Sequence, residues 1–161
     1  MASLFLTRNI LKKHCVAVLF RFDIQSQTYA DTDTLSLYFT KAKQSVITNT
    51  DHITTGIVAD YDNHGKLVSL DIRAASKKTS CHFFNTGAEV DGKPPLAVNW
   101  HYNTEYQQLV VLLSLQDVSI ITNIMETDDP NVSLGMDLIG KLCAVYVSNP
   151  VSNTFTAAKM D

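Results

Sequence analysis

The stretch Gly65-Lys-Leu-Val-Ser-Leu-Asp-Ile72 recurs as Gly140-Lys-Leu-Cys-Ala-Val-Tyr-Val147, 75 residues further along the chain. In both copies a glycine precedes a run rich in apolar residues, which is typical of a β-strand entered from a tight turn. A shorter block, Ser45-Val-Ile-Thr-Asn49, recurs as Ser119-Ile-Ile-Thr-Asn123, with four of the five residues identical. The shared order predicts that the chain consists of two similar halves.

Two further blocks extend this duplication. Thr34 to Phe39 resembles Gln108 to Leu113 at an offset of 74 residues. Val16 to Asp23 resembles Leu96 to Asn103 at an offset of 80, and both blocks carry two aromatic residues, two positions apart. The change of offset predicts a six-residue insertion in the first half, near Gln25 to Ala30.

The composition of the 161 residues favours strands. Val, Ile and Thr number 40, against 6 Gly and 4 Pro, which excludes disorder. The length fits one domain with its own core. We therefore predict an all-β fold with minor α content, an internally duplicated antiparallel β-sandwich or barrel. The formal charge of -3 disfavours nucleic acid and anionic membranes, so we expect neither as a partner.

The repeat also predicts the organisation of the single domain, residues 1–161. Its segments are a covering segment with a short helix or strand (1–15), the first repeat (16–76), a connector (77–95), the second repeat (96–152) and a tail (153–161). The predicted strands are 16–23, 33–40, 45–49, 55–61 and 66–74 in the first repeat, and 96–102, 107–114, 118–124, 132–138 and 141–148 in the second. Asp62-Asn-His-Gly65 predicts a hairpin turn before the last strand of the first repeat.

Alternation along these strands separates an inner from an outer face. The predicted inner set is Val18, Phe20, Phe22, Leu35, Leu37, Phe39, Val68, Leu70 and Ile72, then Val98, Trp100, Tyr102, Leu109, Val111, Leu113, Cys143, Val145 and Val147. The outer face of the first repeat is mostly polar, whereas that of the second is also apolar and needs a cover. The candidates for that cover are the N-terminal segment with Leu4, Leu6, Ile10 and Leu11, the connector around His82-Phe83-Phe84, or a second copy in a homodimer through Val110, Leu112, Ala144 and Tyr146.

A family resemblance rests on Asp33-Thr-Leu-Ser-Leu-Tyr38, on Gly56-Ile-Val-Ala-Asp-Tyr-Asp62 and on the stretch from Gly65 to Ile72. On these motifs residues 22–76 resemble the small family called domain of unknown function 2283, and the second half fits as a diverged copy. The family has no assigned reaction, so the resemblance implies no activity. It implies that one repeat is too small for a stable core and that this chain is a fused pseudo-dimer.

Ligand-binding candidates come from two patterns. In Trp100-His101-Tyr102 and Phe20-Arg21-Phe22, aromatic residues flank a titratable or cationic one, an arrangement that lines a ligand cleft or, equally, places the aromatics in the core. Acidic residues near one hairpin supply a possible acid and base. The candidate residues are Arg21, Trp100, His101, Tyr102, Asp60 and Asp71. The five histidines show no metal-ligand spacing, so we expect no metal and no cofactor.

The cysteines and the hydropathy pattern bear on location. Cys15, Cys81 and Cys143 are odd in number and far apart, which favours reduced thiols in the cytoplasm. No apolar run approaches the length of a membrane helix.

These observations leave two hypotheses for function. The first is a non-catalytic binding or interaction protein. The alternative is a cofactor-free isomerase or cyclase that acts on a hydrophobic small molecule in a cavity between the halves. The feature that discriminates between them is whether the structure has a closed core or an enclosed cavity of at least roughly 300 Å³, lined by aromatic residues and one or two titratable groups.

Overall fold

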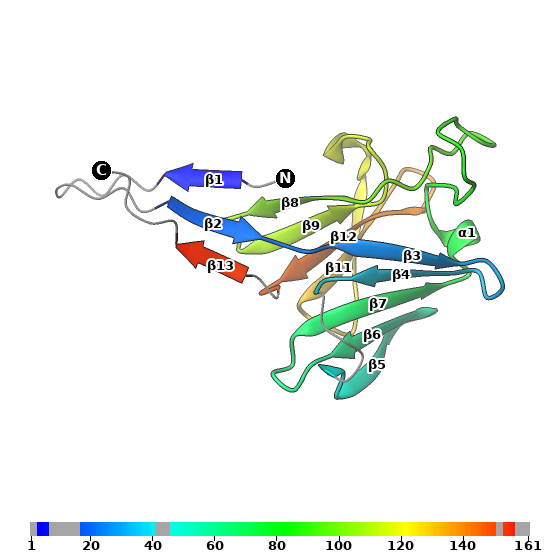
Figure 1. Ribbon diagram of the computed structural model, residues 1–161. Coiled ribbons are helices and arrows are strands. Elements are labelled where there is room, and N and C mark those ends of the chain that lie inside the picture. The colour runs from blue at the N-terminus through cyan, green and yellow to red at the C-terminus, as the bar shows by residue number, and fades with distance from the viewer. Residues whose placement is uncertain (1–2, 7–16, 41–45, 151–152, 157–161) are drawn as a thin grey trace.

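Two five-stranded antiparallel sheets pack face to face in the computed structural model, which describes residues 3–6, 17–40, 46–150 and 153–156 (Figure 1). The first sheet contains, in spatial order, β3 (Gln25–Tyr29), β4 (Thr34–Tyr38), β7 (Leu67–Arg73), β6 (Ile57–Tyr61) and β5 (Asn49–Thr54). The second contains β8 (Asn99–Asn103), β9 (Gln108–Leu112), β12 (Leu142–Ser148), β11 (Val132–Met136) and β10 (Asn123–Glu126). The predicted duplicated all-β architecture is confirmed, as a sandwich.

A small third sheet and two short helical segments complete the described fold. The third sheet contains β1 (Ser3–Leu6), β2 (Ala17–Arg21) and β13 (Asn153–Thr156), with β2 in the centre. It lies at one end of the molecule, whereas the short helix α1 (Ala75–Lys78) lies at the other (Figure 1). A single 3-10 turn, η2 (Val118–Ile120), precedes β10.

The two large sheets share their strand order, and each strand of the first has a counterpart 74 or 75 residues later. Left-handed backbone positions recur with the same offsets. Asp33 and Gln107 have φ values of 47° and 50°, and Gly65 and Gly140 have values of 71° and 79°. Gly65 closes the hairpin turn that the sequence predicted before β7, and Gly140 closes the equivalent turn before β12. A residue without Cβ adopts positive φ at low cost.

The main core lies between the two sheets and uses equivalent residues from each. Leu37 is the cross-strand partner of Leu70, and Val111 is that of Val145. All four side chains are completely buried. The inner faces predicted from alternation therefore meet at the centre of the sandwich.

A β-bulge changes the inner set at the same place in both repeats. The strand register shifts between Asp60 and Tyr61 in the first sheet and at the equivalent position in the second. Leu67 and Leu142 belong to the main core, whereas Val68 and Cys143, which alternation predicted there, are buried outside it. An extra residue on the bulged strand disrupts the regular pairing, and strict alternation does not anticipate it.

The N-terminal alignment of the repeats was wrong. The counterpart of β8 is β3, at an offset of 74, and not the segment 16–23 at an offset of 80. No insertion near Gln25 to Ala30 is therefore needed. All five residues of β3 are exposed, so the strand carries no apolar alternation by which the sequence could reveal it.

Two more strands begin later in the chain than the sequence predicted. Neither 45–49 nor 118–124 forms a strand over its full length, and the edge strands begin at Asn49 and Asn123. In the second repeat, the N–H of Ile120 donates to Asp117 O, which closes the 3-10 turn where a strand was predicted. Of the predicted N-terminal helix or strand, residues 3–6 form a strand, and Ile10 and Leu11 lie outside the described residues.

The outer face of the second sheet is covered by the chain itself. Val110, Leu112 and Ala144 are buried there and pack with Ile121 and Tyr146. Ile121 directly follows η2, so part of the cover comes from the segment between β9 and β10. This segment was not among the expected covers, and a homodimer through this face stays a prediction.

Candidate functional site

The connector between the repeats folds into a closed loop. The backbone N–H of His82 donates to Pro94 O at 2.9 Å, and the N–H of Leu96 donates to His82 O at 2.9 Å. Val90 and Lys93 pair in the same way nearer the loop's tip. The residues His82, Phe83 and Phe84, offered above as a cover for the second sheet, instead line a hollow beside the β3–β4 turn of the first sheet.

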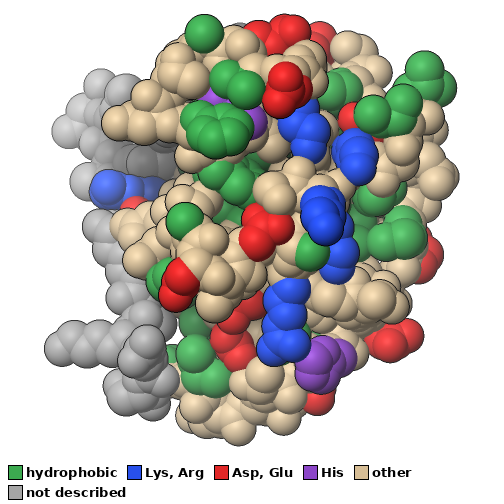
Figure 2. Space-filling model, turned by 90° about the vertical axis from the view of Figure 1, so that its right-hand side faces the viewer, with side chains coloured by type: hydrophobic (Ala, Val, Ile, Leu, Met, Phe, Trp, Pro, Cys, Tyr) green, Lys and Arg blue, Asp and Glu red, His purple; other side chains and the backbone are tan. Residues whose placement is uncertain are grey.

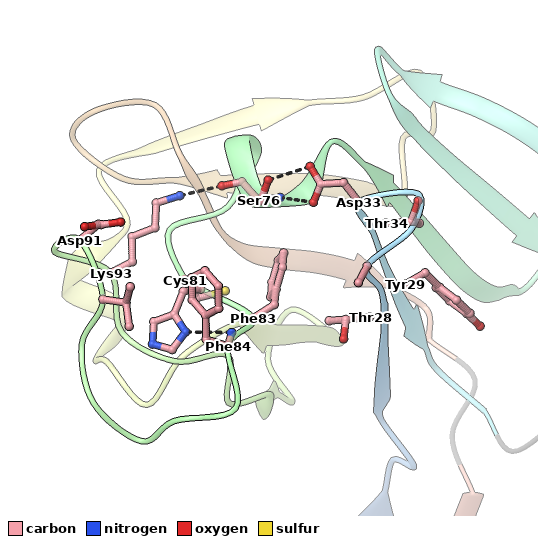
Figure 3. A pocket seen from close by; sticks show the side chains of 13 residues that line it. Thr28, Tyr29, Asp33, Thr34, Ser76, Cys81, Phe83, Phe84, Asp91 and Lys93 are labelled. Atoms are coloured by element: carbon pink, nitrogen blue, oxygen red, sulfur yellow. Dashed lines mark hydrogen bonds between the residues drawn. The ribbon is translucent and has the colours of Figure 1, made fainter.

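A cavity of about 410 Å³ lies between this connector loop and the β3–β4 turn (Figure 3). Its aromatic residues are Tyr29, Phe83 and Phe84. The other lining residues are Thr28, Ala30, Asp33, Thr34, Ser76, Cys81, His82, Val90, Asp91 and Lys93. The volume of the cavity lies within the range of roughly 300–1,000 Å³ for small-ligand sites. It lies between the first repeat and the connector, and not between the two halves.

Asp33 is held at one wall of the cavity by α1. Its Oδ2 accepts the Ser76 hydroxyl at 2.7 Å, and its Oδ1 accepts the Ser76 backbone N–H at 2.9 Å. These two bonds, the hydroxyl bond first, lower the pKa of the Asp33 carboxyl, with smaller effects from Lys77 and Lys93. Asp33 is therefore a fixed, ionised hydrogen-bond acceptor and a weak base.

The His82 ring is fixed by two hydrogen bonds. Its Nδ1 accepts the backbone N–H of Phe84 at 3.1 Å, and its Nε2 lies 2.8 Å from Ala88 O. Because Nδ1 accepts, Nε2 must carry the proton and donate it to the carbonyl. Both ring nitrogens are thus used to shape the connector loop, and neither is free to exchange a proton with a ligand.

Cys81 and Lys93 are two further polar residues of the lining. Burial raises the pKa of the Cys81 thiol, so the sulfur stays protonated and a poor nucleophile. The Lys93 ammonium donates to Ser76 O at 2.8 Å and to Thr79 O at 3.0 Å. The cavity thus combines aromatic walls with two carboxylates, of which Asp33 is fixed by Ser76, and with one fixed ammonium group. This combination suits recognition of a ligand better than proton transfer.

The sequence-predicted aromatic residues lie elsewhere, in a ring cluster beside the main core. Phe22 packs edge-on against Trp100 with ring centroids 5.1 Å apart, and Phe20 lies 4.9 Å from Tyr102. Burial raises the pKa of Tyr102. The two aromatic pairs that the sequence treated as repeat equivalents are instead contact partners in space.

The four remaining candidates are dispersed. Arg21 and His101 are exposed on β2 and β8. Asp71 accepts the Ser36 hydroxyl at 2.5 Å across the outer face of the first sheet. Asp60 on the same face accepts the hydroxyls of Ser69 and Thr50. These hydrogen bonds give both carboxylates a structural role between neighbouring strands. None of the six candidate residues lines the cavity, and their role in ligand binding stays a prediction.

A second hollow, acidic in character, lies where the two sheets meet at β5. The Tyr61 hydroxyl donates to Asp129 at 2.5 Å there and links the first sheet to the β10–β11 loop. Among the described residues, no group of three or more His, Cys, Asp or Glu side chains is arranged to hold a metal ion. No helix in the described part of the chain has the length and apolar character needed to cross a membrane.

The fold and the cavity together define a duplicated β-sandwich with a ligand-sized site at one end of its first repeat. Residues 29–76 match the model of the family described as Protein of unknown function (DUF2283), which confirms the resemblance of the first repeat. No curated protein and no solved structure matches the chain. Both ends of the matched segment, Tyr29 and Ser76, line the cavity. The cavity therefore combines the family segment with the connector that follows it.

Proposed function

We propose that the protein is a non-catalytic binding protein that holds a flat, largely apolar small molecule in the cavity beside the connector. The observation that carries this proposal is the cavity itself, about 410 Å³ with the aromatic side chains of Phe83 and Phe84 in its walls and Tyr29 at its edge. Aromatic rings offer flat apolar surfaces on which a planar ligand stacks, and a few polar groups set its orientation.

The state of the polar groups supports binding over catalysis. An isomerase or cyclase needs a group that gains and loses a proton near neutral pH. Asp33 is held ionised by Ser76, and both ring nitrogens of His82 are engaged by the backbone. The Cys81 thiol is held protonated by burial. The alternative, a cofactor-free isomerase or cyclase, would require one of these groups to leave its present partner or environment.

Binding can be tested with N-phenylnaphthylamine, a neutral aromatic probe whose fluorescence rises in apolar surroundings. We expect saturable binding to the full-length protein and a loss of affinity of at least roughly fivefold in Phe84→Ala, since one aromatic contact contributes about 1 kcal/mol. Phe84 is 67% exposed, so its truncation leaves the core intact.

Tyr106→Ala is the matched control, because Tyr106 is 69% exposed in the β8–β9 turn and does not line the cavity. Its affinity for the probe should equal that of the wild type. Equal affinities in all three proteins, or no saturable binding, would refute the proposed site.

Two further properties belong to this proposal. A cytoplasmic location is supported by Cys81 and Cys143, both buried free thiols of the kind that persist in a reducing compartment. A homodimer through Val110, Leu112, Ala144 and Tyr146 would have to form chiefly through Tyr146, since the other three side chains are buried within the chain.

A further inference from the structure

The face around α1 carries a column of lysine and arginine side chains, although the protein is acidic overall (Figure 2). The lysines Lys77 and Lys78 belong to α1, Lys93 comes from the connector and Lys141 from the second repeat. A cluster of positive charges attracts anionic ligands to that face, even on a protein whose net charge is negative.

The ammonium groups of Lys93 and Lys141 are held by backbone carbonyls. Lys93 donates to Ser76 O and Thr79 O, and Lys141 donates to Lys77 O at 2.6 Å. Since each ammonium group has three N–H donors, Lys93 keeps one further donor and Lys141 keeps two. The carbonyls fix the positions of the charges without neutralising them, because a carbonyl carries only a partial charge.

We propose that the ligand of the cavity is an amphipathic anion, with its apolar aromatic body between the connector and the β3–β4 turn and its anionic group at the Lys93 ammonium. This inference rests on the proposed function and adds the charge of the ligand. Lys93 lines the cavity, and its ammonium group is held by the carbonyl oxygens of Ser76 and Thr79. The Lys141 ammonium is held next to them, by the carbonyl oxygen of Lys77. A carboxylate, sulfonate or phosphate supplies the acceptor geometry that an ammonium donor needs.

Two carboxylates in the lining define the orientation. Asp33 lies across Ser76 from Lys93 and already accepts two hydrogen bonds from that serine (Figure 3). It therefore repels an anionic group toward the Lys93 side. Asp91 precedes Lys93 by two residues in the same loop, so its negative charge weakens the binding of an anionic group at Lys93. Removal of the Asp91 charge should therefore increase the affinity for an anionic ligand, so this variant tests the proposal through a gain of affinity.

The experiment compares two probes that share an aromatic body. Anilinonaphthalene sulfonate carries a sulfonate that N-phenylnaphthylamine lacks, so their affinity ratio measures the contribution of the anionic group. We expect the sulfonate probe to bind about three- to tenfold more tightly to the wild type. Added salt should weaken the sulfonate probe and leave the neutral probe unchanged.

Lys93→Met should abolish the preference for the sulfonate and leave the affinity for the neutral probe unchanged. Lys66→Met is the matched control, because Lys66 also donates to a backbone carbonyl across the repeats, that of Asn149, and lies outside the cavity. Asp91→Asn should increase the preference by about two- to threefold. Asn tolerates the positive φ of 50° at this position, so this variant keeps the fold even if Lys93→Met does not.

The outcomes separate the two proposals. Equal affinity for both probes in the wild type, or a preference that survives Lys93→Met and does not respond to Asp91→Asn, would overturn the anionic ligand while the neutral probe still supports the cavity. Failure of the neutral probe in the wild type, or its indifference to Phe84→Ala, would overturn the binding function itself.

Discussion

Truncation of Leu70 tests the central claim that the two repeats share one core. The side chain is fully buried and lies opposite Leu37 on β4 and Ala59 on β6. Leu70→Ala removes three carbons, which costs about 2.5 kcal/mol in lost transfer free energy at about 0.8 kcal/mol per carbon. The cavity that remains raises the expected cost to about 3–4 kcal/mol, within the range of roughly 2–5 kcal/mol for such changes.

Urea denaturation of Leu70→Ala and Leu138→Ala, the same chemical change at a site 86% exposed, provides the measurement. We expect a loss near the core estimate for Leu70→Ala and less than about 0.5 kcal/mol for Leu138→Ala. The thermal midpoint should fall by roughly 6–16 °C in the core variant, at about 2–4 °C per kcal/mol for a protein of this size. Similar stabilities for the two variants would refute the placement of Leu70 at the centre of the sandwich.

Four further outcomes are expected. Gly56→Ala should cost more than Gly140→Ala by about 1 kcal/mol in urea denaturation, because both residues have positive φ but only at Gly56 does a Cβ meet a lysine ammonium; equal losses would contradict this reasoning. Tyr61→Phe should lose about 1–2 kcal/mol through its broken bond to the facing loop, and an unchanged unfolding midpoint would show that bond to be unimportant. Leu112→Glu should destabilise the protein in thermal melts rather than dissociate it in sedimentation experiments, since the chain itself covers this residue; a stable, newly monomeric variant would instead establish the dimer. The lowered pKa of Asp33 stabilises the fold above the unfolded pKa of about 3.9, so the stability advantage over Asp33→Asn should decline below that value and disappear once pH falls through the lower pKa of the folded state; an advantage that persists after both forms are protonated would refute the assigned ionisation.

Most of the fold could be predicted from the sequence, because the duplication presents each strand pattern twice, once in each repeat. The offset of 74 or 75 residues holds for the five strands of each sheet. The error arose where aromatic similarity between residues 16–23 and 96–103 competed with that offset. A constant offset applied to the clear strand Asn99–Asn103 would have found Gln25–Tyr29, although every side chain of that strand is exposed and carries no alternation.

The cavity was harder to predict because it depends on the path of a loop. His82-Phe83-Phe84 indicated an apolar segment in need of a surface, but neither spacing nor composition placed that surface at Tyr29. Fixed geometry at the site comes from Asp33, whose side chain reaches a serine 43 residues later. Short-range patterns do not report such long-range side-chain contacts, so a search centred on alternating aromatics led to the core cluster around Trp100 instead.

The places where the two repeats differ explain why the candidate site is at the first repeat alone. The repeats exchange similar contacts through equivalent lysines, since Lys66 donates to Asn149 O in the second repeat and Lys141 donates to Lys77 O just after the first. This reciprocity is what a fused pair of equivalent units would show. The left-handed position of Asp33 recurs at Gln107, where no carboxylate is present to hold a following serine. The connector, moreover, folds over the end of the first sheet. Duplication therefore accounts for the scaffold, whereas the acid at position 33 and the connector, both outside the symmetry, account for the ligand-sized cavity.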